Sequence, residues 1–189
     1  MNHNAIDAGA TAFVKVEVPA AWAEAADSAD ETVLEGRGKT VKMVKSILDP
    51  VGRMDGDSLP VSAFVDHADG TFELGASAYE KRGVSAFVPE WNSATCVQCN
   101  QCAYVCPHAV IRPVPMTEAE LAAAPAGVKS KDMTGLPGLK FVMTISPMDC
   151  TGCGSCVNVC PGNNKAETLT LKPLESQLDQ DAVFIYGTK

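Results

Sequence analysis

The chain has 189 residues, with 46% hydrophobic residues, 20% charged residues and a formal net charge of −8. These values are ordinary for a soluble globular protein with one or two small domains, and the length leaves room for a core. Residues 1–90 carry 15 acidic and 8 basic side chains, and residues 91–189 carry 8 and 7. No basic patch suggests nucleic-acid binding, so we expect no nucleic-acid partner.

The beginning of the chain has no basic segment followed by an apolar core, which a secretory signal would need. No apolar run approaches the roughly 18 residues that would span a bilayer. We therefore expect no membrane contact and a cytoplasmic protein, in which thiols stay reduced.

The first part of the chain predicts short elements. FVKVEV at residues 13–18 alternates and predicts a strand that ends at Pro19. The Ala- and acid-rich stretch after it predicts a short helix that fades into a mobile segment up to Gly38. KTVKMVKSILDP at residues 39–50 has apolar residues at helical spacing, and Pro50 is the expected stop.

Four later segments predict strands. VSAFV at residues 61–65 and TFEL at residues 71–74 predict a hairpin across DHADG. KFVMTI at residues 140–145 and TLTLKPL at residues 168–174 predict two more strands.

Two cysteine runs are the most informative feature of the sequence. All eight cysteines lie in CVQCNQCAYVCP at residues 96–107 and CTGCGSCVNVCP at residues 150–161. Both runs have the form C-x2-C-x2-C-x3-C-P, so we expect two copies of a loop–helix–strand unit related by a pseudo-twofold axis. Between them, Thr117 and Glu120 predict a capping box for a small helix at residues 118–123.

The spacing of the cysteines limits the kinds of site that they can form. A disulfide scaffold would scatter cysteines between elements, whereas dense thiols in a reducing compartment indicate metal or redox chemistry. Zinc also uses C-x2-C and stays as an alternative. Three closely spaced thiolates can bind three irons of one cubane, and the fourth iron then needs a ligand from elsewhere.

The complete run is similar to that of bacterial ferredoxins, in which the fourth cysteine serves the other cluster. This likeness implies two [4Fe–4S] clusters. One would be held by Cys96, Cys99, Cys102 and Cys160, and the other by Cys150, Cys153, Cys156 and Cys106.

A longer stretch resembles one enzyme family. GDSLPVSAFV and DGTFELGASAYEKRGVSAFVPEWN, running into the first cysteine run, closely resemble pyruvate:ferredoxin (flavodoxin) oxidoreductase, and YEKRG matches its EKR segment. SPMDCTGCGSCVNVCPG and LKPLESQ look like the second cluster loop of that family and its exit. The resemblance implies an α+β fold: residues 1–38 closing a preceding domain, a small α/β EKR segment at 39–90, and a two-cluster bacterial-ferredoxin-like domain at 91–189.

The family enzyme cleaves pyruvate with coenzyme A, using thiamine diphosphate and three [4Fe–4S] clusters. In this chain DGD at residues 55–57 does not fit the G-D-G of a thiamine site. The resemblance thus implies an electron-transfer fragment or subunit that is not catalytic alone and passes electrons to ferredoxin or flavodoxin. Thiamine diphosphate, coenzyme A and the third cluster would bind the remaining domains. A free-standing two-cluster ferredoxin and a non-redox metal or interaction module are the alternatives.

Two sets of charged residues have expected roles. Glu80, Lys81 and Arg82 are consecutive and cannot share one face of a helix or strand. We therefore expect ion pairs with neighbouring domains rather than contacts with coenzyme A or a carrier. Several members of a second set are expected to flank the outermost cluster and to steer an acidic acceptor: Lys129, Lys131, Lys140, Lys165 and Lys172.

Overall fold

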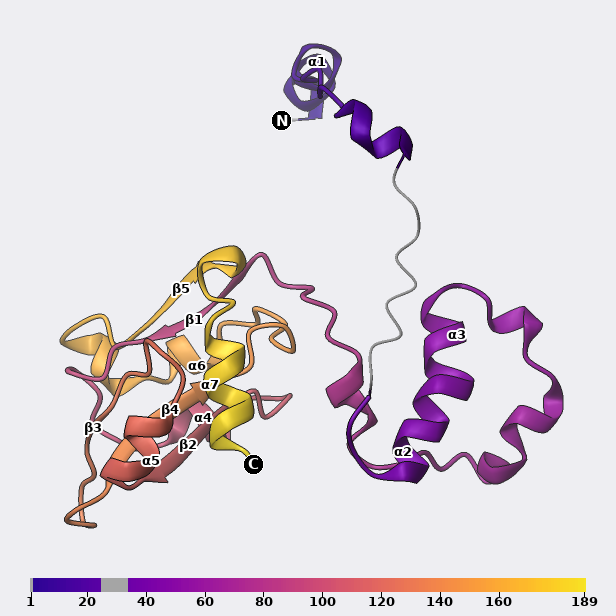
Figure 1. The fold of residues 1–189 in the computed structure, drawn as a ribbon. Coiled ribbons are helices and arrows are strands. Elements are labelled where there is room, and N and C mark those ends of the chain that lie inside the picture. Colours follow the sequence, from indigo (N-terminus) through magenta and orange to yellow (C-terminus); the bar gives the residue numbers. More distant parts are fainter. Residues whose placement is uncertain (1, 25–33) are drawn as a thin grey trace.

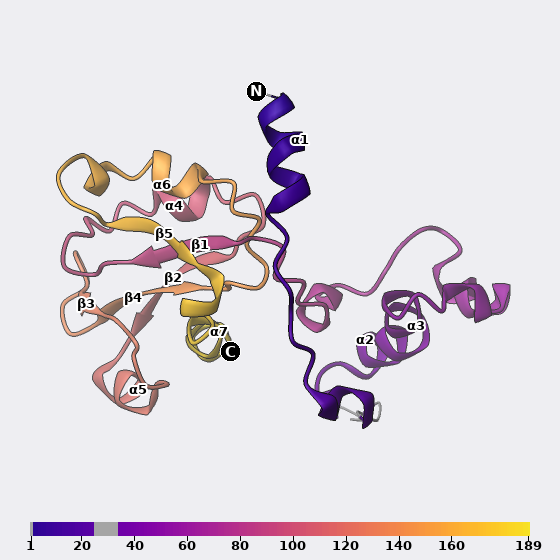
Figure 2. The same ribbon diagram turned by 90° about the horizontal axis from the view of Figure 1, so that it is seen from above.

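The computed structural model describes residues 2–24 and 34–189. Helix α1 (Asn2–Thr11) is seen end-on in Figure 1, with a 3-10 turn (Ala20–Glu24) after it. The segment between them, residues 12–19, runs extended in Figure 2. The strand expected at 13–18 is therefore wrong: the backbone is extended, but it has no neighbouring strand among the described residues. Most of the helix expected after Pro19 lies outside the described residues.

One helical stretch follows, built from α2 (Gly38–Met43), a π-helical turn (Val44–Leu48) and α3 (Asp49–Gly52). Of the predicted apolar residues, Val44 and Ile47 are buried, whereas Val41 and Leu48 are half-buried; Met43 is buried beside them. The expected stop at Pro50 is wrong, because the helix continues to Gly52. Pro50 lies in the first turn of α3, where its missing N–H is tolerated.

The hairpin expected at residues 61–74 is also wrong, since Val61–His67 is a 3-10 helix and 71–74 is irregular within the described part of the chain. The Asp69 carboxylate accepts hydrogen bonds from Thr71 N at 3.0 Å and Thr71 Oγ1 at 2.7 Å. These local bonds satisfy the backbone without a partner strand. Further 3-10 turns lie at Gly56–Ser58 and Ala76–Tyr79, so residues 39–79 have helical turns where a hairpin was expected. The expected EKR segment at 39–90 still contains strand residues, because β1 (Phe87–Trp91) begins within it.

The remaining residues form an α+β domain with two antiparallel sheets (Figure 2). In the first sheet, β1 (Phe87–Trp91) pairs with β5 (Leu169–Pro173). In the second, the strand order is β2-β4-β3, with bounds Ile111–Met116, Lys140–Ile145 and Lys131–Asp132. The strands predicted from KFVMTI and TLTLKPL are confirmed as β4 and β5.

Strand β4 lies at the centre of the core. Phe141, Val142, Met143, Thr144 and Ile145 are all buried because β4 has neighbours on both edges and α7 (Gln180–Gly187) packs across it. Its partner β2 contains two prolines, which a strand at the edge of a sheet tolerates because its outer N–H groups need no partner.

Three short helices complete the domain. Helix α5 (Glu118–Ala123) begins with the predicted capping box, in which Glu120 N donates to Thr117 Oγ1 and Thr117 N donates to Glu120 Oε2. Helices α4 (Gln101–Tyr104) and α6 (Ser155–Asn158), one from each cysteine run, pack against each other. Across the described residues, none of the helices combines the length and the apolar character needed to traverse a bilayer.

Candidate metal centres

The two cysteine runs share a backbone conformation at equivalent positions. Gln98 and Gly152, two residues after the first cysteine of each run, have φ of 57° and 66°. Asn100 and Gly154, which precede α4 and α6, have φ of 59° and 74°. These left-handed residues turn each loop back over its first cysteine.

The turn in each loop brings a backbone donor to a sulfur. Gln98 N lies 3.3 Å from Cys96 Sγ, and Gly152 N lies 3.4 Å from Cys150 Sγ. At 3.4 Å, Val110 N is a third such donor, to Cys106 Sγ. Backbone N–H groups directed at thiolate sulfur are the contacts that tune the potential of iron–sulfur sites.

The eight thiols line two separate cavities. One cavity is lined by Cys96, Cys99, Cys102 and Cys160, and the other by Cys106, Cys150, Cys153 and Cys156. Each cavity therefore combines three cysteines of one run with the fourth cysteine of the other. Packing of α4 against α6 makes this exchange possible, because each helix lies between the third and fourth cysteine of its run.

Each cavity is lined by enough thiols for a metal centre. In residues 2–24 and 34–189, no three His, Cys, Asp or Glu side chains come close enough to share a single metal ion. Four thiols nevertheless surround each cavity. Four thiols are the number of protein ligands that one [4Fe–4S] cluster takes.

The thiols differ in burial and acidity. Cys102 and Cys156 are each 8% exposed, and burial raises the pKa of Cys102 to about 12 and that of Cys156 to about 11. Burial also raises the pKa of Cys150. Cys153 is exposed, and hydrogen bonding with the backbone and the hydroxyl of Ser155 lowers its pKa. Iron binds thiolates, so its positive charge would have to offset the desolvation of the buried sulfurs.

Two residues that line the first cavity each have a buried polar atom without a partner. Trp91 and Asn100 both line it, and Trp91 Nε1 and Asn100 Oδ1 have no hydrogen-bond partner in the part of the chain that the structure describes. A buried donor without an acceptor is costly, by about 1–3 kcal/mol. The sulfurs of a bound cluster could accept from such a donor.

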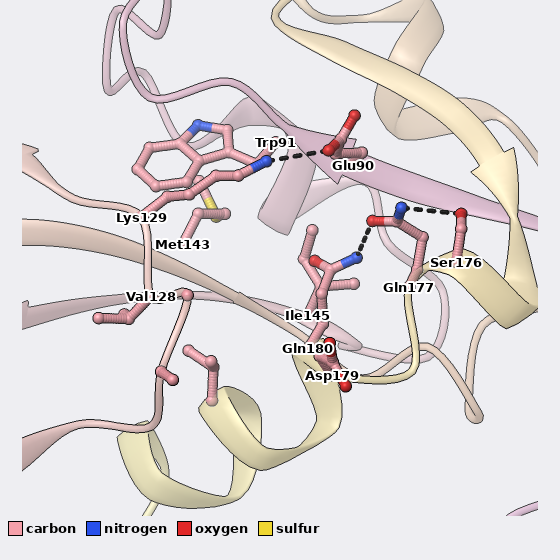
Figure 3. Close-up of a pocket in the computed structure, with 13 residues that line it drawn as sticks. Glu90, Trp91, Val128, Lys129, Met143, Ile145, Ser176, Gln177, Asp179 and Gln180 are labelled. Carbon is pink, nitrogen blue, oxygen red and sulfur yellow. Dashed lines mark hydrogen bonds and ion pairs between the residues drawn. The ribbon is translucent and has the colours of Figure 1, made fainter.

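Trp91 and Met143 separate the first cavity from a cavity of about 210 Å³ that contains no cysteine (Figure 3). At its edge Lys129 Nζ pairs with Glu90 Oε1 at 3.0 Å. Opposite, Gln180 Nε2 donates to Gln177 Oε1 at 2.8 Å. The polar groups around this cavity thus bond to one another and not toward the thiols.

Three of the five lysines expected to steer an acceptor are engaged within the domain. Lys129 pairs with Glu90, and Lys140 Nζ lies 2.7 Å from Asp132 Oδ1. Lys131 Nζ donates to the carbonyl of Cys96 at 2.7 Å, which fixes the first loop instead of facing a partner. Sequence reasoning missed this anchoring contact because nothing in the pattern around Lys131 distinguishes it from a solvated lysine.

The expected ion pair between the EKR triplet and a neighbouring domain is present. Lys81 pairs with Asp149 and Asp181 of the cysteine-containing domain, whereas Arg82 pairs with Glu80. Asp149 lies directly before Cys150, so this contact is one residue away from a thiol that lines the second cavity.

Two family models match the chain. The EKR model, a domain of unknown function, matches residues 30–85. The 4Fe-4S dicluster domain matches residues 95–164, which contain all eight cysteines. The dicluster match supports iron–sulfur binding within residues 95–164 and does not support a non-redox module.

Relatives match almost the whole chain. A pyruvate-flavodoxin oxidoreductase of Enterobacter agglomerans is 48% identical over 187 residues, which are 99% of this chain and 15% of the relative. A pyruvate:ferredoxin oxidoreductase of Moorella thermoacetica is 45% identical over 93% of this chain and 14% of its own length. A mitochondrial pyruvate dehydrogenase [NADP(+)] of Euglena gracilis is 39% identical over 85% of this chain and 9% of its own length. The chain thus spans about a seventh or less of these relatives, and a free-standing carrier is not favoured.

Proposed function

Since this chain belongs to the pyruvate:ferredoxin (flavodoxin) oxidoreductase family, we propose that it is the electron-relay part of such an enzyme. The observation that carries the proposal is the division of eight cysteines between two adjacent cavities, each lined by four thiols. When bound there, two [4Fe–4S] clusters would supply one-electron redox chemistry.

The first cluster would be held by Cys96, Cys99, Cys102 and Cys160, and the second by Cys150, Cys153, Cys156 and Cys106. The backbone donors at Gln98 and Gly152 support this assignment because each points at the first sulfur of its run. Each cavity has one exposed thiol, Cys99 or Cys153, where an electron could enter or leave near the surface.

A pseudo-twofold relation between the two runs is part of the proposal. Matching left-handed residues, matching short helices and a constant offset of 54 positions support it. Because α4 packs against α6, the relation would put the two clusters close together, as rapid transfer between them requires.

The remaining roles concern the longer protein. We assign residues 1–38 to the end of a preceding domain, 39–90 to the EKR segment and 91–189 to the two-cluster domain. Pyruvate, coenzyme A, thiamine diphosphate and a third cluster would bind other domains, and ferredoxin or flavodoxin would accept the electrons. A cytoplasmic location would keep the eight thiols available for iron.

Cluster content tests the proposal directly. After anaerobic reconstitution we expect about eight iron and eight sulfide per chain, because each proposed ligand set is complete for one cubane. Electron paramagnetic resonance (EPR) of the dithionite-reduced protein should show two interacting centres. Four irons per chain, or stoichiometric zinc, would refute the assignment.

The exchange of the fourth cysteine needs its own test. Cys106→Ala should alter the same EPR signal as Cys153→Ala, which removes a ligand from the second set. Cys99→Ala is the matched control, and it should alter the other signal. If Cys106→Ala matches Cys99→Ala instead, each run binds its own cluster and the exchanged ligand sets are wrong.

A further inference from the structure

The three side chains of the EKR triplet, Glu80, Lys81 and Arg82, do not share one environment. Glu80 and Arg82 lie two residues apart and pair with each other, with Arg82 Nε 2.8 Å from Glu80 Oε1. Their side chains are 43% and 70% exposed, whereas that of Lys81 is 25% exposed. Of the three side chains, Lys81 is therefore the one that turns inward.

Lys81 contacts the segment that leads from β4 to the second cysteine loop. Its ammonium donates to Ser146 Oγ at 2.9 Å and to the Asp149 carboxylate, and Asp181 Oδ1 of α7 lies 3.7 Å away. Ser146 is fully buried, and its hydroxyl also donates to Asp149 Oδ2 at 2.6 Å. Asp149 is therefore held from two sides, one residue before Cys150.

Two further contacts follow Lys81 at intervals of two residues. Gly83 N donates to Met148 O at 2.9 Å, and a Cβ at Gly83 would lie 2.9 Å from Met148 Cε. A Cβ at Gly152, which has φ of 66°, would overlap Ser85 Oγ. Lys81, Gly83 and Ser85 thus face the same side and contact residues 148–152, with both glycines allowing the close approach.

We propose that residues 81–85, here called the EKR clamp, position the second cysteine loop, and that Lys81 is its positioning residue. This role is assigned to a domain whose function is unknown, and it rests on the proposed binding of a cluster at that loop. Lys81 fixes Asp149, and through it the place where Cys150 enters the second cavity. It also neutralises one of the two carboxylates, Asp149 and Asp181, that lie beside the loop.

Removing the ammonium should therefore affect one cluster and not the other. Lys81→Met keeps most of the aliphatic stem but removes the positive charge. The net charge of Lys81, Asp149 and Asp181 together then changes from −1 to −2. Added negative charge disfavours an electron at the second cluster. We expect about a tenfold fall in its equilibrium constant for reduction, which equals about 59 mV for one electron.

The matched control is Arg82→Met, which removes the neighbouring cation from an exposed pair. In EPR-monitored redox titrations of the cluster-loaded protein, Lys81→Met should lower the potential of the centre that Cys153→Ala alters. Arg82→Met should leave both potentials unchanged. Lys81→Arg keeps the positive charge, so its potential should stay close to that of the wild type. Equal shifts in Lys81→Met and Arg82→Met, or no shift in either, would overturn the proposal.

Amide hydrogen exchange gives a readout that does not depend on cluster potential. Exchange at residues 146–152 should accelerate in Lys81→Met and not in Arg82→Met, and exchange in the first loop should be unchanged. If both clusters are lost together in Lys81→Met, the lysine supports the domain generally and the clamp is refuted. A wild-type protein that binds no iron would instead refute the proposed function, while the exchange experiment would still test the clamp.

Discussion

Asn163 is the side chain whose removal should disturb the cysteine-containing domain most for its size. It lies just after Cys160, and its amide makes four hydrogen bonds. Nδ2 donates to Val157 O and Leu169 O at 3.1 and 2.8 Å. Oδ1 accepts from Thr168 N and Leu169 N at 2.8 and 2.9 Å. One side chain thus joins α6, the turn after Cys160 and the start of β5.

The magnitude follows from those four contacts. Each hydrogen bond contributes about 0.5–1.5 kcal/mol net, and a buried group left without a partner costs about 1–3 kcal/mol. Thr168 and Leu169 are each 2% exposed, so water cannot easily replace Oδ1. We therefore expect Asn163→Ala to lower the free energy of unfolding by about 3 kcal/mol, which for a chain of this size lowers the melting temperature by roughly 6–12 °C.

The assay is thermal unfolding of the cluster-loaded protein under anaerobic conditions, followed by circular dichroism and by bleaching of the visible absorbance. Asn164→Ala is the matched control, since Asn164 is an exposed neighbour and a surface substitution changes stability by about 0.5 kcal/mol or less. Bleaching should also begin earlier in Asn163→Ala because Cys160 loses its support. If the two variants melt within about 2 °C of each other, the hydrogen-bond argument is refuted.

Three further predictions concern the loops. In the cluster-free chain, iodoacetamide should label Cys153 first, because its pKa is lowered and the thiolate is the nucleophile. Cys102, with a pKa of about 12, should react last. Mass spectrometry of the labelled protein at several pH values checks this order. Gly152→Ala should reduce iron content far more than Gly154→Ala, since both have positive φ but only Gly152 faces Ser85; equal iron content would contradict this. Lys165→Glu, at an exposed site near Cys160, should slow electron transfer to flavodoxin at low salt by a severalfold factor that 0.5 M salt removes. Stopped-flow rates that ignore charge and salt would exclude steering.

The elements that could be predicted are those encoded by a short local motif or by an apolar run that this chain itself buries. The capping box at Thr117 and Glu120 needs only four residues, and the apolar run of β4 implies burial whatever covers it. The strand expected at residues 13–18 failed because alternation marks a strand only where another strand can pair with it. The side chains of Val14, Val16 and Val18 are exposed in this chain.

The candidate site was predictable for a different reason. Eight cysteines at repeated spacing restrict the chemistry strongly, and the structure gathers them around two cavities in the grouping that the ferredoxin likeness implied. The contacts that hold the loops were not predictable. Lys81 and Lys131 act through partners 35 or more residues away, and Asn163 bonds several backbone groups at once. No short pattern encodes such contacts.

The exchange of one cysteine between the runs also bears on how the domain resists unfolding. With the proposed ligand sets, one cluster cross-links Cys102 to Cys160 and the other cross-links Cys106 to Cys150, so the second closed loop is nested inside the first. By the chain-entropy argument used for disulfides, a closure of this length restricts the unfolded chain by about 4 kcal/mol at 25 °C, and a nested closure adds less. The inorganic groups would thus serve as covalent staples of a small core. Removal of iron should therefore expose residues 107–149, which contain β2, α5, β3 and β4, to proteases. This exposure should accompany the loss of electron transfer.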